Sequence, residues 1–119
     1  MMQNDGMILR VVFYRTKFGS EPVREWLLGL SQEQKKAIGT ELKVVQYGWP
    51  LGMPVVRKMD ANLWEARVTI PDGIARVLFT VDGSSLVLLH GFVKKSQKTP
   101  QGELETAKRR LHQHRDAHT

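Results

Sequence analysis

The strongest constraint on the fold is a change of hydrophobic period within the chain. Apolar and polar residues alternate through 63–70, as they do in a strand with one buried face. Asp72-Gly73 follows, a pair typical of a two-residue hairpin turn. The apolar segments 74–81 and 86–93 come next, separated by Asp82-Gly83-Ser84. The second half of the chain therefore predicts an antiparallel meander.

The first half has a helical period instead. A β-branched and aromatic segment at 8–14 predicts one strand, and 22–30 has apolar residues at helical spacing. Ser31-Gln32-Glu33-Gln34 matches a capping box, which begins a second helix, and Gly48–Gly52 ends it. Because almost no loop separates these two helices, we expect an antiparallel helix hairpin.

The C-terminal part completes an α+β domain. Thr99 is expected to cap a last helix that begins at Pro100. The order β-α-α-β-β-β-α, with an extra short strand near Val55–Lys58, predicts a mostly antiparallel sheet covered by the N-terminal helix hairpin and the C-terminal helix. The chain has 119 residues, which suits one domain spanning 1–119. The ends, 1–6 and 115–119, are expected to be loose tails.

Composition favours a soluble, basic protein of a reducing compartment. The chain has 18 Lys and Arg against 12 Asp and Glu, a net charge of +6, and no cysteine. Disulfides, cysteine zinc sites and thiol catalysis are therefore excluded. The longest apolar run, Leu86–Leu89, is far shorter than the ~20 residues of a membrane span. No secretory signal is visible, so we expect a cytoplasmic protein with affinity for polyanions or acidic partners.

Two arginines of the meander are expected to share one face. If Asp72-Gly73 is the turn, Thr69 pairs with Arg76, and Arg67, Thr69 and Arg76 lie together, opposite the apolar face. Two neighbouring arginines repel each other unless an anion or a carboxylate lies between them. The alternative is a solvated sheet face on which Glu65 pairs with one of them.

A basic segment follows the last predicted strand. Lys94, Lys95 and Lys98 lie just before the expected helix start, an arrangement that suits phosphate binding, although solvated surface lysines are the plainer interpretation. The direction of His90 depends on the turn at 82–84. A three-residue loop places His90 opposite Arg76, with Phe92 on the same face, whereas a two-residue turn points His90 into the core.

No metal site is expected. His112, His114 and His118 lie near the C-terminus, but the first pair lacks i, i+4 spacing, so we interpret them as an adventitious surface cluster. Phosphate-loop, dinucleotide, serine-hydrolase and zincin motifs do not occur in the sequence.

Three segments of the second half carry a family resemblance. The succession Leu63–Arg67, Ala75–Phe79 and Leu88–Pro100 resembles the phage-derived HigB-like branch of the RelE/ParE toxin superfamily. The pattern extends from Arg57 to Arg110, and the first strand and helices fit the order of the superfamily. The resemblance implies a RelE-like fold and the toxin half of a type II toxin–antitoxin pair. It also implies ribosome-dependent cleavage of mRNA, without a cofactor.

The implied chemistry relies on cationic side chains. RNA supplies its own nucleophile, the 2′-hydroxyl, and the protein must move protons and stabilise charge on the phosphorane. We expect Arg67 and Arg76 to bind the scissile phosphate, because guanidinium matches phosphate bidentately. His90 is the candidate general acid or base. If it faces the core, Lys94 or Lys95 must serve instead.

The remaining candidates are RNA-binding residues. Arg57 and Lys58 match the place where the family carries further basic residues. Phe92 is a candidate for stacking on a base, and Lys98 for holding the RNA backbone. No tyrosine occurs in the late strand, where some RelE members carry one.

Two other functions remain open at this stage. One is a ParE-like inhibitor of DNA gyrase on the same scaffold, and the other is a non-catalytic basic nucleic-acid-binding module. Under the toxin interpretation, the expected partners are mRNA on the ribosome and a helix-turn-helix antitoxin that covers the basic face. No membrane partner is expected, and oligomers are expected only through the antitoxin.

Overall fold

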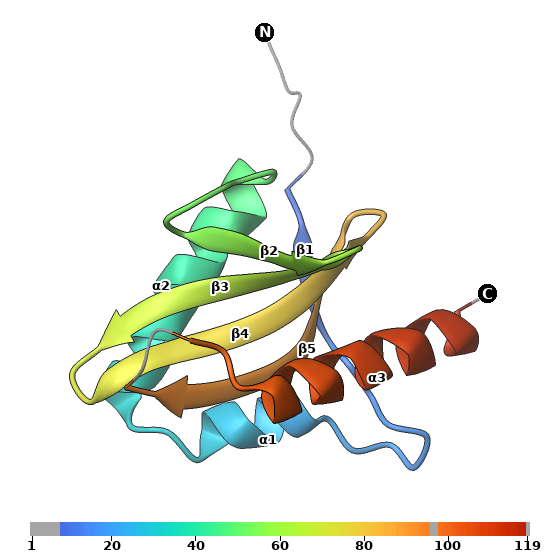
Figure 1. Cartoon of the computed structure of the whole chain (residues 1–119), viewed down its shortest axis with the longest axis horizontal. Coiled ribbons are helices and arrows are strands. Elements are labelled where there is room, and N and C mark those ends of the chain that lie inside the picture. Colours follow the sequence, from blue (N-terminus) through green and yellow to red (C-terminus); the bar gives the residue numbers. More distant parts are fainter. Residues whose placement is uncertain (1–7, 96–97, 119) are drawn as a thin grey trace, which may run out of the picture.

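The chain forms one five-stranded sheet between two helical layers (Figure 1). The computed structural model describes residues 8–95 and 98–118. The strands are β1 (Arg10–Phe13), β2 (Val56–Asp60), β3 (Leu63–Ile70), β4 (Gly73–Asp82) and β5 (Ser85–Lys94), and the helices are α1 (Pro22–Leu28), α2 (Gln32–Gly48) and α3 (Gln101–Ala117). The strand order is β1-β5-β4-β3-β2. The pairing of β1 with β5 is parallel and the others are antiparallel, which confirms the mostly antiparallel α+β architecture.

The face covered by α1 and α2 is apolar. The capping box at Ser31 is present, and Ile38, Leu42 and Val45 of α2 are buried against the sheet. The expected antiparallel helix hairpin does not form. Figure 1 shows α2 crossing the sheet steeply, whereas α1 lies along β5. Each helix buries its apolar face on the strands, so the short connection only joins them.

A close approach between α1 and β5 depends on one glycine. The indole ring of Trp26 lies directly over Gly91, where a Cβ atom would come within 2.3 Å of the ring atom Cζ3. A larger residue at 91 would therefore push α1 away from the sheet.

The register of the meander differs from the expected one in two places. β3 and β4 are joined through Pro71 and Asp72, so Ile70 pairs with Gly73 and Arg67 lies directly opposite Arg76. The turn at Gly83-Ser84 has two residues, since Asp82 pairs with Ser85. A β-bulge then shifts the register, because Phe79 pairs with Leu88 but Leu78 pairs with His90. Neither turn hypothesis alone anticipates this outcome.

α3 covers the other face of the sheet. It begins at Gln101 after Pro100, and Thr99 does not cap it; the Thr99 hydroxyl is used elsewhere, as described below. The helix continues to Ala117, so residues 115–117 are not a loose tail. The expected tail at 1–6 and residue 119 lie outside the described residues. Within the described chain, no helix has the length and apolar character needed to cross a bilayer.

Candidate functional site

Cationic side chains from three neighbouring strands meet on the α3 face. Arg67 of β3 lies opposite Arg76 of β4, which in turn lies opposite Phe92 of β5. On the outer strand, Arg57 lies opposite Glu65. Because residues at every second position share a face, Arg57, Glu65 and Arg67 project to the same side. We call Arg57, Glu65, Arg67, Arg76 and Thr99 the arginine cluster.

Glu65 is the anion at the centre of this cluster, and it is fully buried. Its Oε1 accepts a hydrogen bond from Arg67 Nε at 3.0 Å, and its Oε2 accepts one from the Thr99 hydroxyl at 2.6 Å. Arg76 Nη1 donates to the same hydroxyl at 3.1 Å. One carboxylate therefore orients Arg67 directly and Arg76 through Thr99, which fixes both guanidinium groups before any ligand arrives.

The two arginines differ in depth. Arg76 is 0% exposed and its guanidinium carbon lies 6.0 Å from the centre of the Phe92 ring, whereas the Arg67 side chain is 15% exposed. Burial lowers the pKa of Arg76, the Glu65 carboxylate opposes that change, and the nearby Arg67 and Arg57 lower the pKa further. A guanidinium still stays charged at neutral pH. Only Arg67 of this pair therefore presents its cation at the surface.

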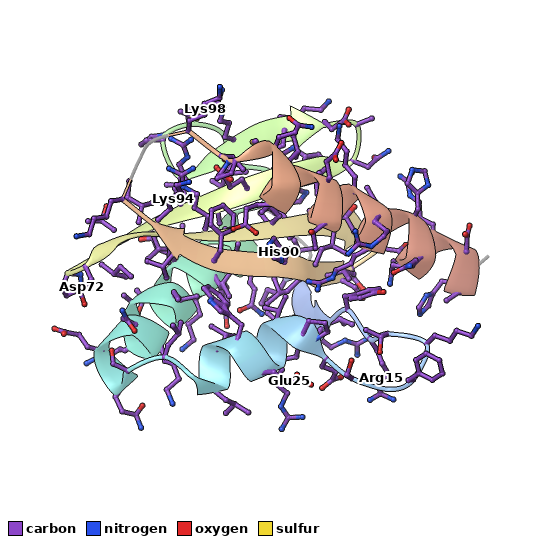
Figure 2. The ribbon with its side chains drawn as sticks, turned by 60° about the horizontal axis from the view of Figure 1, so that its bottom comes forward. Arg15, Glu25, Asp72, His90, Lys94 and Lys98 are labelled. Carbon is purple, nitrogen blue, oxygen red and sulfur yellow. The ribbon has the colours of Figure 1, made fainter. Side chains whose placement is uncertain are left out.

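The lysines lie at one end of this face. Lys94 ends β5 on the same side of the sheet as Phe92, and Lys95 and Lys98 flank the segment that leads to α3; all three are exposed. Figure 2 shows Lys94 and Lys98 close to the start of α3, with His90 farther along β5. Arg57 is also exposed. The surface around Arg67 is therefore rich in cations, and the central carboxylate is buried beneath it.

Lys58 does not belong to this surface. It pairs with Trp64, which packs on the α1/α2 side, so its side chain leaves the opposite face of β2 from Arg57. The two candidate RNA-binding residues Arg57 and Lys58 therefore lie on opposite faces of β2, because adjacent residues of a strand point to opposite faces.

His90 lies on the α3 face because of the bulge, and both of its ring nitrogens have partners. Nε2 is 2.7 Å from Glu103 Oε1, and Nδ1 is 3.2 Å from Arg110 Nη1. Arginine can only donate, so Nδ1 accepts from Arg110, and the Nε2–H donates a hydrogen bond to Glu103. Arg110 also donates to the Leu89 carbonyl at 2.9 Å, and burial lowers its pKa. His90 thus links β5 to α3.

Several residues of these networks are not evident from sequence reasoning. From the sequence, Glu65 is expected only as a partner for an arginine on a solvated face, and Thr99 is expected only as a helix cap. The i, i+2 spacing of Glu65 and Arg67 is a signal that they share a face, but burial of the carboxylate depends on α3 and the segment before it. No comparable spacing in the sequence indicates that Glu103 and Arg110 contact His90.

The C-terminal histidines also take part in packing. His114 is 7% exposed, and its Nε2 lies 3.1 Å from Asp82 Oδ2. This burial corrects the expectation of a purely surface cluster. Across residues 8–95 and 98–118, no group of three or more metal-ligating side chains is gathered.

The fold and the cluster define a small basic α+β protein with a preorganised arginine surface. Residues 25–112 match the family described as phage-derived protein Gp49-like (DUF891). The chain therefore belongs to this phage-derived family, which is RelE-like and associated with toxin–antitoxin systems. A search of curated proteins gives no match to the chain.

Proposed function

We propose that this protein is the toxin of a type II toxin–antitoxin pair, with a RelE-like topology of the HigB-like branch, and that it cleaves mRNA on the ribosome. The observation that carries the proposal is the gathering of three arginines, from three adjacent strands, around one buried carboxylate. The exposed cations Arg57 and Lys94 lie on the same face of the sheet. Such a surface suits a phosphodiester and the extra charge of its transition state.

In this proposal, Arg67 contacts the scissile phosphate. Its side chain is partly exposed, and Glu65 accepts a hydrogen bond from its Nε, which fixes the direction from which the guanidinium donates to a phosphate. Arg76 is a positioning residue, because it is buried and is linked through the Thr99 hydroxyl to the Glu65 carboxylate that holds Arg67. The sequence suggests the same role for both arginines, but in this proposal the exposed Arg67 contacts the phosphate and the buried Arg76 positions it.

The reaction needs no external nucleophile. The 2′-oxygen attacks the adjacent phosphorus, the bond from phosphorus to the 5′-oxygen breaks, and the products are a 2′,3′-cyclic phosphate and a free 5′-hydroxyl. One group must take the proton of the 2′-hydroxyl and one must protonate the leaving 5′-oxygen. The positive charge of Arg67 stabilises the phosphorane between these two steps.

We assign proton transfer to Lys94 or Lys95. Both are exposed, at and just after the end of β5, whereas His90 is engaged at both nitrogens. Lys98 and Arg57 are assigned to the RNA backbone. Phe92 is 8% exposed and packs against Arg76, so its role is to support that guanidinium rather than to stack on a base.

The test is primer extension on translated mRNA after induction of the protein in cells. New 5′ ends inside coding regions are expected with the natural chain. Arg67→Ala is expected to lower their formation by about 10²–10³-fold, as loss of a transition-state donor does. Arg24→Ala, an exposed arginine of α1 on the other side of the sheet, is the control and should cleave normally.

Each other outcome points to a different protein. A DNA-damage response without RNA cleavage would favour the gyrase inhibitor, and growth arrest with neither would favour a non-catalytic nucleic-acid binder. Cleavage by Arg67→Ala at the rate of the natural chain would contradict the assignment of Arg67 to the scissile phosphate. The proposal also includes a cytoplasmic location and a helix-turn-helix antitoxin, which co-expression from the neighbouring reading frame would test by restored growth.

A further inference from the structure

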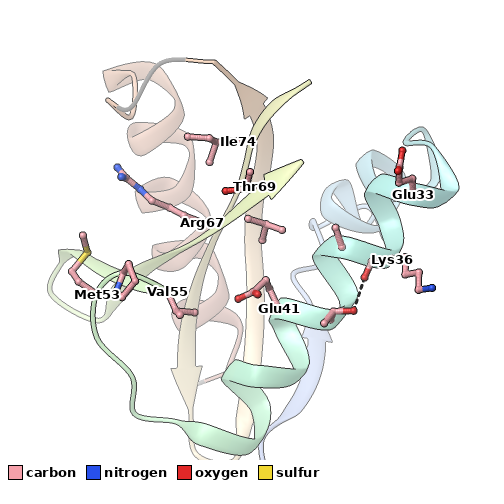
Figure 3. Close-up of a pocket in the computed structure, with 12 residues that line it drawn as sticks. Glu33, Lys36, Glu41, Met53, Val55, Arg67, Thr69 and Ile74 are labelled. Carbon is pink, nitrogen blue, oxygen red and sulfur yellow. Dashed lines mark hydrogen bonds between the residues drawn. The ribbon is translucent and has the colours of Figure 1, made fainter. Parts of the chain in front are cut away.

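A groove of about 860 Å³ lies between α2 and the edge of β3 (Figure 3). It adjoins the arginine cluster, because Arg67 lines the groove and also donates to Glu65. A groove of this size accommodates an organic ligand such as a nucleotide. Its apolar lining comes from α2, the segment before β2, β3 and β4, through Ala37, Met53, Pro54, Val55, Val68 and Ile74.

Glu41 of α2 supplies a partly buried carboxylate to this groove. In Figure 3 its side chain extends from α2 toward the strand edge and Val55, whereas Lys36 extends away from them. Within the part of the chain that the structure describes, the Glu41 carboxylate has no hydrogen-bond or ion-pair partner. A carboxylate that has lost part of its hydration gains from an outside donor. Both of its oxygens are therefore available to a ligand.

We propose that this groove binds a guanine base of the RNA substrate, with Glu41 reading its Watson–Crick edge. Guanine presents two adjacent donors there, N1–H and N2–H, and these match the two oxygens of one carboxylate. Adenine and cytosine each present one donor beside an acceptor, and uracil presents one donor between two acceptors. The apolar lining suits the faces of the ring. Guanine is thus the one common RNA base that satisfies both oxygens of Glu41.

Glu41 and Arg67 divide a bound nucleotide between them. The carboxylate repels phosphate, so the part of the RNA that enters beside it is the base. The guanidinium attracts phosphate, and because Arg67 lines the same groove, the phosphodiester stays next to the arginine cluster. That the ligand is RNA rests on the proposed function, and the groove adds to it a preference for cleavage beside a guanine.

A simple cation is a poorer occupant of the groove. The lining carries two anions, Glu33 and Glu41, and two cations, Lys36 and Arg67, so its formal charges cancel. The whole chain has a net charge of +6, which opposes the approach of a polyamine or a basic peptide. Guanine is neutral and gains the same hydrogen bonds without that cost.

The experiment measures binding without cleavage. The ¹⁵N-labelled full chain is titrated by NMR with three 2′-O-methyl RNA trimers, UGU, UIU and UAU, in which I is inosine. The methyl group removes the nucleophile, and inosine lacks only the exocyclic amine of guanine. UGU is expected to shift the amides of residues 37–41 and 67–69. It should bind about 10-fold more tightly than UIU or UAU, because each loses a hydrogen bond to a charged group.

Two variants assign the preference to one side chain. Glu41→Gln keeps the shape of the side chain but replaces one acceptor oxygen with an amide donor, so it should bind the trimers without preferring UGU. Glu25→Gln makes the same change of charge at an exposed position on α1, outside the groove, and should keep the preference. Arg67→Ala should cleave poorly and bind RNA more weakly, but keep the ratio of the UGU and UIU affinities.

Several outcomes would overturn the guanine site. These are equal affinity for UGU and UIU, shifts that leave out residues 37–41, no shifts with any trimer, or an unchanged preference in Glu41→Gln. Spermidine that shifts the same amides as strongly as UGU would assign the groove to cations and overturn it as well. A preference for UGU in a chain that cleaves no mRNA would support the guanine site and contradict only the proposed function.

Discussion

The two faces of the sheet are stabilised in different ways. The face under α1 and α2 buries apolar side chains, including an aromatic group in which Trp49 packs edge-on against Trp64 at 4.9 Å. The face under α3 has a smaller apolar core and holds the buried polar side chains of the described chain. These are Glu65, Arg76, Thr80 and His114.

This difference indicates that the fold depends less on the α3 face than on the α1/α2 face for its stability. A buried ion pair costs desolvation energy, and apolar residues of similar volume often stabilise a protein as well or better. The burial of the arginine cluster around Glu65 therefore does not explain how the sheet is stabilised. It is a good way to hold guanidinium groups in fixed directions at a surface. The α1/α2 face maintains the fold, and the α3 face carries preorganised charge.

The largest expected effect tests whether Glu65 supports this charged face. Glu65→Gln keeps the shape of the side chain but removes the counter-charge of Arg67 and of the fully buried Arg76. Loss of one partner of a buried pair costs about 3–5 kcal/mol. Urea unfolding should show this loss, and Glu105→Gln, at an exposed position on α3, should change little. Equal stability of the two variants would mean that Arg76 is not buried beside that carboxylate in solution.

A smaller effect is expected on the apolar face. Gly91→Ala places a methyl group inside the Trp26 ring and should destabilise the protein by about 1–3 kcal/mol, as overpacking does. Gly39→Ala, on α2 with open space around it, should instead stabilise it by up to about 1 kcal/mol. Thermal unfolding of both variants measures the difference. If Gly91→Ala were neutral, α1 would not pack closely on β5.

The third prediction compares the faces at adjacent residues of β2. Arg57 lies with the arginine cluster, whereas Lys58 lies on the other face. Arg57→Ala should weaken binding of single-stranded RNA. It should also reduce the magnitude of the slope of log K against log salt concentration by about 0.7. Lys58→Ala should leave that slope unchanged. The measurement is fluorescence anisotropy of a labelled RNA at several salt concentrations, and equal slopes for both variants would contradict the assignment of the surface.

The sequence predicts much of the fold because its local signals agree with each other. The capping box at Ser31 and the alternation in 63–70 are both confirmed. The register is predicted less well. A one-residue shift of the hairpin turn changes the partner of Arg76 from Thr69 to Arg67, and the bulge beside His90 has no signal in the sequence.

The candidate site was predictable in its residue types but not in its depth. Arginines on two consecutive strands of a hairpin fall on one face by alternation alone, so Arg67 and Arg76 could be grouped. Their exposure depends on what covers them. Thr99 reaches back from the start of α3 to Glu65, a contact between residues 34 positions apart that no local pattern specifies. Which arginine meets a ligand is therefore decided by tertiary structure.

The smallest expected effect concerns a solvated contact between α3 and the sheet. Asp60 accepts the Ala61 backbone N–H at 2.8 Å, and one of its oxygens lies 3.1 Å from Lys108 Nζ. These contacts, the backbone N–H first, hold the pKa of Asp60 below its usual value of 3.8. The folded state thus favours the charged carboxylate. Its contribution is present above the unfolded pKa and is lost as pH falls through the lower folded pKa.

Asp60→Asn should therefore make stability fall less steeply in acid, as measured by urea unfolding from about pH 5 to about pH 2. The change should be slight, because the side chains of Lys108 and Asp60 are 40% and 48% exposed and water screens them. Asp72→Asn, at an exposed position in the turn between β3 and β4, is the matched control. Identical acid profiles for the natural chain and Asp60→Asn would mean that α3 is held only by its buried contacts, which places the whole strength of that face in its interior networks.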